Sequence, residues 1–343
     1  MDEDSFQQIQ DLGFAKLIKK FEALAVTHND AVLQGIGDDA SVARQREGYV
    51  TCSTSEIFLE GVHFDLTYTP FHHLGYKIVT AAVSDIYAMN AEPEQVLISV
   101  AIPNKYSVQM MEQLYKGIGA ACADYDVQLG GGDTTASHQM LAISAAATGS
   151  VKEKDAVYRS GAKKDDIICV TGDLGGALAG LRVLLREKKA WQESERKQHF
   201  QPDLQEYETV IQKQLIPKAR KDLVKAIHES KIKPTSMIDV TQGLVSELSR
   251  LALQSNLGIE IYSPAIPIAL QTRAVADEMN EDVDKYAFYG GEDFEMLFTL
   301  PEALIEKFKA EFDDFVVVGK MTDKDKELTI NTGEEQDYRI DIF

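Results

Sequence analysis

The sequence contains few cysteines, no long apolar run and a shortage of positive charge. Its 343 residues include three cysteines, Cys52, Cys122 and Cys169, which lie too far apart to suggest a zinc cluster or a disulfide framework. A reducing compartment is therefore expected. No segment approaches the roughly 18 apolar residues of a membrane-spanning helix, and the acidic first residues lack the apolar core of a secretory signal. We expect a cytoplasmic protein without a membrane span.

Basic residues are outnumbered by acidic ones. The chain has 35 Lys and Arg against 55 Asp and Glu, a formal net charge of −20. An excess of acid disfavours nucleic acid or an anionic membrane as a partner and favours cations. The hydrophobic content of 44% is that of an ordinary globular protein. Because a single core rarely grows beyond about 250–300 residues, the length favours two domains.

The signatures of the common nucleotide-binding folds are also missing. The sequence has no G-x-x-x-x-G-K-[ST] loop and no H-R-D kinase set. The turn at residues 172–176 lacks the G-x-G-x-x-G spacing, so a plain strand-to-helix turn is its simpler interpretation. If the protein binds a nucleotide, it uses a different architecture.

Hydrophobic periodicity predicts a mixed α/β chain. Helices are expected at residues 12–25, 74–89 and 108–124, and strands at 49–52, 95–103 and 140–149. The charged stretch 152–166 has no apolar periodicity and precedes a new strand at 167–170. It predicts a boundary between an N-terminal domain, residues 1–150, and a C-terminal domain, residues 151–343.

The C-terminal part is expected to continue with a helix at 177–186. Residues 186–214 are dense in charged and amide side chains. We interpret them as a solvated helical excursion without a catalytic role.

Acidic residues recur beside small, turn-forming residues. Six segments share this feature: Gly35-Ile36-Gly37-Asp38-Asp39, Ser53-Thr54-Ser55-Glu56, Ser84-Asp85, Gly130-Gly131-Gly132-Asp133-Thr134-Thr135, Ile238-Asp239-Val240-Thr241 and Gly290-Gly291-Glu292-Asp293. Carboxylate and hydroxyl oxygens are ligands for magnesium, which usually shares its coordination with substrate phosphates. Converging carboxylates without a cation would repel one another. The pattern therefore indicates a site for divalent ions bridged by a nucleotide.

Each segment alone also has a structural interpretation. Asp38-Asp39 fits a surface turn, Asp133 a turn cap and Asp85 the polar face of a helix. His63, between two apolar residues, fits a packed histidine. Arg159 could bind phosphate through its guanidinium or belong to a charged linker. Six such segments in one chain favour the functional interpretation.

The ordered segments resemble those of the thiamine-monophosphate kinases, in the superfamily of aminoimidazole ribonucleotide synthetase and selenophosphate synthetase. The stretches that carry the resemblance are Gly35-Ile36-Gly37-Asp38-Asp39-Ala40, Leu59-Glu60-Gly61-Val62-His63-Phe64, Leu74-Gly75-Tyr76-Lys77, Val83-Ser84-Asp85-Ile86-Tyr87-Ala88-Met89, Gly131-Gly132-Asp133-Thr134-Thr135, Arg159-Ser160-Gly161-Ala162-Lys163 and Gly290-Gly291-Glu292-Asp293-Phe294-Glu295. They follow the family order over roughly residues 12 to 300.

The resemblance implies a two-domain α/β fold of the aminoimidazole ribonucleotide synthetase type and a homodimer formed by the N-terminal domains. It implies transfer of the γ-phosphoryl group of ATP to thiamine monophosphate with several Mg²⁺ ions. The implied metal ligands are Asp39, Thr54, Ser55, Glu56, Asp85, Asp133 and Asp239. The implied ATP contacts are Tyr115, Gly132, Asp133, Arg159 and Thr241. His63 and Glu292 would face the thiamine substrate, and Tyr338 is the candidate for a stacking aromatic.

Three departures from the family pattern leave alternatives open. Glu56 stands where the family usually has Asp, Gln242 replaces another Asp, and the closing aromatic motif is altered near Tyr338. The chain could therefore be a binding protein that has lost catalysis, or a kinase of another phosphorylated acceptor. For the leading hypothesis we assign no catalytic nucleophile or base, because a phosphate acceptor with a second pKa of about 6 is already mostly dianionic at neutral pH. The hypothesis requires Asp39, Asp85, Asp133 and Asp239 to converge.

Overall fold

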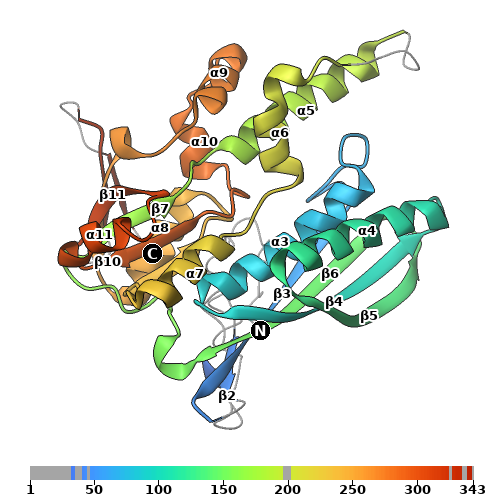
Figure 1. Ribbon diagram of the computed structural model, residues 1–343. Coiled ribbons are helices and arrows are strands. Elements are labelled where there is room, and N and C mark those ends of the chain that lie inside the picture. The colour runs from blue at the N-terminus through green and yellow to red at the C-terminus, as the bar shows by residue number, and fades with distance from the viewer. Residues whose placement is uncertain are drawn as a thin grey trace, which may run out of the picture.

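The computed structural model describes residues 32–34, 41–44, 47–195, 202–323, 327–333 and 338–341. The helix predicted at residues 12–25 lies outside these ranges. Two sheets, each associated with its own helices, make up the described part (Figure 1). The prediction of a mixed α/β fold with two structural units is confirmed.

The N-terminal unit is built on a six-stranded sheet with the order β1-β2-β3-β6-β4-β5. Its strands are β1 (Val32–Gln34), β2 (Ser41–Arg44), β3 (Tyr49–Leu59), β4 (Glu92–Pro103), β5 (Gln128–Ser137) and β6 (Ala142–Lys152). Neighbouring strands run antiparallel except β4 and β5, which are parallel. The strands predicted at 49–52, 95–103 and 140–149 are confirmed, with longer bounds.

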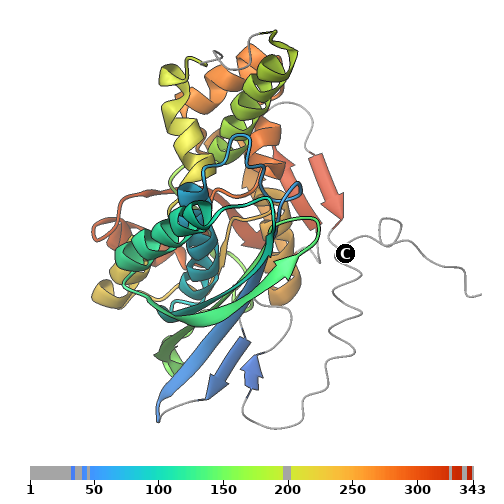
Figure 2. The ribbon, with the colours of Figure 1, turned by 90° about the vertical axis from the view of Figure 1, so that its right-hand side faces the viewer.

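One face of this sheet carries helices and the other does not. In β4, Val96, Ile98 and Val100 are buried whereas Leu97 and Ser99 are exposed, the alternation of a strand covered on one side. The buried side packs against α3 (Phe71–Ala88) and α4 (Val108–Tyr125), which confirms the helices predicted at 74–89 and 108–124. No described helix covers the opposite face (Figure 2), which we call the open face.

The C-terminal unit is built on a seven-stranded sheet with the order β13-β12-β9-β11-β7-β10-β8. Its strands are β7 (Ile167–Thr171), β8 (Ser236–Asp239), β9 (Gly258–Tyr262), β10 (Met296–Leu300), β11 (Phe315–Thr322), β12 (Glu327–Asn331) and β13 (Tyr338–Asp341). The strand predicted at 167–170 is β7. Only the pair of β12 and β9 is parallel.

Helices surround the second sheet and reach the first. They are α5 (Gly176–Glu193), α6 (Glu208–Leu215), α7 (Lys221–Ser230), α8 (Leu244–Ser255), α9 (Leu270–Met279), α10 (Asp284–Tyr289) and α11 (Glu302–Lys309). Within this part of the chain, no helix combines the length and the apolar character that a bilayer span requires.

Helix α3 lies between the two units (Figure 1). From Leu74 to Ala88 every residue is buried, because the helix packs on the first sheet with one side and faces the C-terminal unit with the other. Its apolar residues share one continuous core with Leu223 and Val224 of α7 and with Phe298 of β10. The two units therefore share one buried apolar core, and polar groups on α3 face the junction.

Two local predictions are corrected by the structure. The triple glycine of residues 130–132 lies inside β5 rather than in a turn, since an added Cβ on Gly132 would lie 1.7 Å from the Ile98 oxygen of β4. Of the stretch 186–214, α5 extends to Glu193, and α6 packs on α5 with Val210, Gln214 and Leu215 buried. The end of this stretch is part of the core and reaches the junction.

Candidate active site

Two hydroxyl–carboxylate pairs meet where α3 passes between β3 and β8. Thr54 Oγ1 of β3 donates a hydrogen bond of 2.5 Å to Asp85 Oδ2, and Ser84 Oγ donates one of 2.5 Å to Asp239 Oδ2. Asp85 is 8% exposed and Asp239 1% exposed. Because Ser84 and Asp85 are consecutive on α3, residues far apart in sequence place two buried carboxylates at one junction of the two units.

Alternation along β3 separates the residues predicted around Glu56. Cys52 and Phe58 are buried against the helices, so Thr54 and Glu56 point to the same side. Ser55 is exposed on the open face. The structure thus brings Thr54 to Asp85, whereas the Ser55 side chain points away from that pair.

Asp133 also lies on the open face. The strand register aligns Ile57, Ser144, Ser99 and Asp133 in one row across β3, β6, β4 and β5. These four residues line a shallow depression of about 180 Å³. Three strand spacings of about 4.8 Å separate β3 from β5. Within this chain the sheet lies between Asp133 and Asp85, so the expected convergence does not include Asp133.

A cavity of about 400 Å³ at the junction combines the two predicted substrate residues. It is lined by His63 after β3, Lys77 of α3 and Glu292 before β10. Leu181 and Leu185 of α5 supply apolar wall. We call it the junction cavity. Its mixture of apolar surface with a few charged groups is typical of a pocket for a small polar ligand.

His63 is oriented by the backbone. The Leu59 N–H donates to His63 Nδ1 at 3.0 Å, so the neutral ring carries its proton on Nε2. Glu60 anchors the same loop by accepting from Tyr106 Oη at 2.5 Å and from the Leu141 N–H at 2.9 Å. These bonds, with an ion pair from a lysine, hold the pKa of Glu60 below its usual value although partial burial opposes them. His63 therefore offers an N–H donor at the cavity.

Glu292 does not stand alone in the cavity. Lys77 Nζ lies 2.9 Å from Glu292 Oε2 and 2.9 Å from the Gln214 carbonyl oxygen. The Lys77 side chain is 6% exposed and that of Glu292 35%. A buried ammonium thus connects α3, the end of α6 and the segment before β10. No sequence pattern indicated this pair, because its members are 215 residues apart.

Three residues at the rim of the junction cavity were not predicted. Tyr68 lines it, and burial, together with the charges of Asp65 and Glu292, raises the Tyr68 pKa. Lys188 of α5 forms an ion pair with Asp65 across the rim. The rim therefore joins the two units a second time, and the Lys188 ammonium lies over the Tyr68 ring, 6.0 Å from its centre.

The Gly290-Gly291-Glu292-Asp293 segment is shaped by its backbone. Gly291 has a φ of +71°, and a Cβ there would lie 2.4 Å from the Thr241 oxygen. The Glu292 N–H donates to the same Thr241 oxygen at 3.0 Å. This bond ties Glu292 to the end of β8, two residues beyond Asp239.

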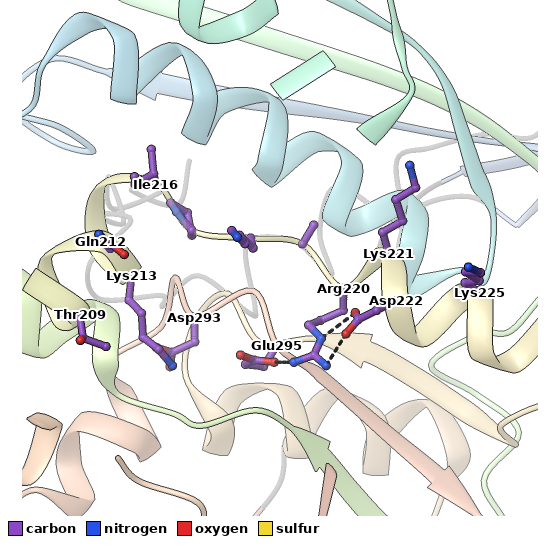
Figure 3. A pocket seen from close by; sticks show the side chains of 13 residues that line it. Thr209, Gln212, Lys213, Ile216, Arg220, Lys221, Asp222, Lys225, Asp293 and Glu295 are labelled. Atoms are coloured by element: carbon purple, nitrogen blue, oxygen red, sulfur yellow. Dashed lines mark hydrogen bonds and ion pairs between the residues drawn. The ribbon is translucent and has the colours of Figure 1, made fainter. Parts of the chain in front are cut away.

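Asp293 and Glu295 line a different cavity, of about 650 Å³, from the one that Glu292 lines (Figure 3). Asp293 accepts from the N–H groups of Gly175 and Ala177, at 2.8 and 3.2 Å, at the start of α5. Burial raises the Asp293 pKa to about 7 despite these bonds. Glu295 is paired with the buried guanidinium of Arg220 at 2.9 Å. We interpret both carboxylates as parts of the framework that holds Glu292.

Gln242 is engaged away from the two carboxylate pairs. Its side-chain oxygen accepts from Arg250 Nη2 at 2.5 Å, and its backbone N–H donates to Glu247 Oε1 at 2.9 Å. The side chain is exposed, and it is fixed along α8. Thr241 lies within 3.5 Å of the same Glu247 oxygen.

The other predicted residues occupy separate places. Tyr115 is 38% exposed on α4. The Arg159 carbonyl oxygen accepts from Ser255 at the end of α8, which begins next to Thr241, so Arg159 and Thr241 lie at opposite ends of that helix. Tyr338, 65% exposed, lies on the edge strand β13, across the sheet from β8. Asp39 lies outside the described residues.

The oxygen atoms of the described site residues are suitable ligands for magnesium. They belong to hydroxyls and carboxylates, and a hard cation prefers oxygen to sulfur. In the described ranges no group of three or more His, Cys, Asp or Glu side chains forms a ready metal site. Magnesium is commonly held by one or two carboxylates together with substrate phosphates. The arrangement suits ions that arrive with a phosphorylated ligand rather than a permanent protein cage.

Comparisons with known proteins assign the chain to a family. Residues 37–151 match the model of the AIR synthase related protein, N-terminal domain, and residues 163–331 match that of its C-terminal domain. The thiamine-monophosphate kinase of Bacillus subtilis is 31% identical over 83% of this chain and 82% of its own length. That of Aquifex aeolicus is 32% identical over 86% of this chain and 87% of its own length.

Comparisons with solved structures support the same family assignment. A structure described as AaThiL complexed with AMPPCP and TMP superposes with a TM-score of 0.79 at 28% identity, covering 98% of this chain and 99% of that one. The thiamine monophosphate kinase of Aquifex aeolicus gives a TM-score of 0.76 at 29% identity, covering 94% and 98%. Identity above 30% over most of both chains, with a matching fold, means that this chain belongs to the thiamine-monophosphate kinase family of the AIR synthase-related superfamily.

Proposed function

We propose that this protein transfers the γ-phosphoryl group of ATP to thiamine monophosphate and forms thiamine diphosphate. The observation that carries the proposal is the junction itself, where two buried carboxylates and a cavity with paired charges lie between the two units. Family membership and the relative complexed with AMPPCP, an ATP analogue, and TMP support it.

The barrier to this reaction is electrostatic. A phosphate monoester attacks a triphosphate, so two anions must approach in line. Bound Mg²⁺ would neutralise charge on both phosphorylated molecules. Thr54 and Asp85 on one side of α3, and Asp239 on the other, are the described residues that would hold it, with Glu56 adjacent on β3. The chain then needs no nucleophile, and its task is to bind and align.

In this proposal the junction cavity holds the thiamine part. The thiazolium ring carries a fixed positive charge, which favours an aromatic face and nearby carboxylates. Tyr68 and Glu292 provide these features, and the Nε2–H of His63 adds a hydrogen-bond donor. Tyr68 takes the stacking role for which Tyr338 was the candidate, because Tyr338 lies at the far edge of the second sheet.

The composition of the open face favours a homodimer. The open face carries exposed Ile57 and Leu97 beside Asp133 and Ser55, and no described helix covers it. Pairing two such faces would bury this apolar surface and bring Asp133 of one protomer toward a second sheet. We therefore propose that Asp133, Gly132 and Ser55 complete an ATP site together with the partner.

The proposed domains are residues 1–150 and 151–343. Residues 150–155, at the end of β6 and in the short turn after it, are the natural place for this boundary, since the family models end and begin at residues 151 and 163. All three cysteines are buried and none forms a disulfide, which fits a reaction in the cytoplasm.

The function is tested by incubating purified protein with ATP, MgCl₂ and thiamine monophosphate and resolving the thiamine phosphates by chromatography. Thiamine diphosphate is the expected product. ATP binding without product would identify a protein that has lost catalysis, as the replacement at Gln242 suggests. Product from another phosphorylated acceptor but not from thiamine monophosphate would identify a kinase of different specificity.

The shared site is tested by mixing two variants, Asp85→Asn and Asp133→Asn. If Asp133 acts on the partner's Asp85, half of the randomly mixed dimers have one intact site, so mixing restores about a quarter of wild-type activity. If both act within one chain, mixing restores nothing. Light scattering on each variant controls for loss of the dimer.

A further inference from the structure

A second cavity at the junction is lined by more positive than negative side chains. It measures about 640 Å³ and lies between the end of β6, the start of β3 and the end of α7. Figure 1 shows α7 beside the connection that leaves β6 for β7. Four lysines line it, Lys152, Lys154, Lys231 and Lys233, against the carboxylates of Glu92 and Asp155. This excess of two positive charges is notable in a chain of net charge −20.

The lysines of this cavity lack carboxylate partners. Lys233 Nζ lies 2.6 Å from the Lys154 carbonyl oxygen and 3.5 Å from that of Ala156. No described carboxylate forms an ion pair with any of the four ammonium groups. Glu92 is itself 3.4 Å from His228 Nδ1, and that interaction keeps the Glu92 pKa low. Glu92 therefore has a partner on α7 other than the four lysines, whose ammonium groups can face an anion.

One buried hydrogen-bond acceptor in the wall of this cavity has no described donor. Asn90 is 1% exposed and lines the cavity, and its Nδ2 donates to the Asp155 carbonyl oxygen at 2.9 Å. Its Oδ1 accepts no hydrogen bond from any described residue. A buried oxygen without a hydrogen-bond donor is unfavourable. A ligand with a hydroxyl or N–H group would satisfy it.

We propose that this cavity binds a small phosphate ester that bears hydroxyl groups, with its phosphates on Lys152, Lys154 and Lys231 and a hydroxyl on Asn90. Such a ligand would touch β6 of one unit and α7 of the other at once. It would therefore stabilise the relative placement of the two units across the same junction that holds the acidic site. Neither the proposed reaction nor its residues require this cavity.

The test is titration calorimetry with fructose 1,6-bisphosphate and, separately, inorganic tripolyphosphate, in low salt with EDTA so that magnesium-dependent binding elsewhere is silent. We expect the sugar phosphate to bind the wild type with a Kd below about 1 mM. The double variant Lys152→Glu/Lys231→Glu should weaken it at least about tenfold. Lys307→Glu/Lys309→Glu, with the same charge change on α11, is the matched control and should bind as the wild type does.

The Asn90 contact is tested with Asn90→Gly, which tolerates the φ of +58° at this position. The variant should weaken sugar-phosphate binding by several fold and leave tripolyphosphate binding unchanged. Absence of binding to the wild type, or equal losses in the α11 control, would overturn the site. Binding of tripolyphosphate alone would overturn the assignment to a phosphate ester.

Discussion

Glu292 and Asp293 are neighbours in one motif but occupy different environments. Glu292 is partly exposed in the junction cavity and pairs with Lys77. Asp293 is buried on the other side, where the start of α5 holds it, and Glu295 is fixed by Arg220. One sequence motif therefore contains both groups that face a ligand and groups that hold the framework. Burial and partners, rather than residue type, tell them apart.

Among substitutions in this framework, the largest loss of stability is expected at Arg220. Its guanidinium is bonded to Glu295, Asp222 and Asp314, and Arg220→Met would leave the buried Glu295 without a counter-charge. We expect the free energy of unfolding to fall by about 3–5 kcal/mol. Urea denaturation measures this, and Arg182→Met, at an exposed ion pair on α5, is the control. A loss below about 1 kcal/mol would show that Glu295 does not depend on Arg220.

The protonation of Asp293 should make the stability of the protein depend on pH. Because burial raises its folded pKa to about 7, above the ordinary 3.8, its protonated form is favoured in the fold. That contribution to stability is complete below pH 3.8 and is lost as pH rises through about 7. The stability of Asp293→Asn relative to the wild type should therefore increase as the pH rises from 5 to 8, by about 3 kcal/mol. The same dependence of melting temperature on pH in both proteins would contradict the assignment.

Lys77 should affect both binding and stability. Lys77→Met keeps most of the packing volume but removes the ammonium that contacts Glu292 and the Gln214 carbonyl. We expect a loss of about 1–3 kcal/mol of stability and a KM for thiamine monophosphate raised about tenfold. Steady-state kinetics and urea denaturation of one preparation measure both. An unchanged KM would place the pair outside the substrate site.

Glu292→Gln should act mainly on binding. The Gln side chain keeps an oxygen that can accept from the buried Lys77 ammonium, but it loses the negative charge that would face the thiazolium. The KM should therefore rise about tenfold, or about 1.4 kcal/mol, with a stability change of at most about 1 kcal/mol. A large stability loss without a KM change would reverse the comparison and make Glu292 the framework residue.

The smallest effect is expected at Gln242. Its side chain is held by Arg250, so Gln242→Asp should form an ion pair there and change activity and the magnesium requirement by less than about twofold. A magnesium titration of the rate measures this. A strongly lowered magnesium requirement would instead place position 242 at the metal site.

Periodic patterns account for most of the fold that the sequence predicted. Helix α3 and strand β4 follow from their apolar spacing, which burial then enforces. Strand β5 did not follow, because glycine is disfavoured in strands and only the close approach of Gly132 to β4 explains it. Helical propensity could not show that α6 would be drawn into the core by its contact with α5.

The residue types of the site could be predicted from the sequence, but their arrangement in space could be predicted only in part. The acidic segments identified Asp85 and Asp239, and alternation along β3 would have separated Ser55 from Thr54. The pairing of Lys77 with Glu292 depends on how two units dock, which no local pattern encodes. The placement of Asp133 on the opposite face likewise follows from strand order.

The decisive measurement is transfer of label from γ-labelled ATP to thiamine monophosphate by the wild type, Asp85→Asn and Asp239→Asn. Direct transfer at the junction predicts labelled thiamine diphosphate from the wild type, no labelled protein, and rates lowered at least about 100-fold in both variants with the fold retained in circular dichroism. A trapped phosphoprotein, or wild-type rates from either variant, would contradict it.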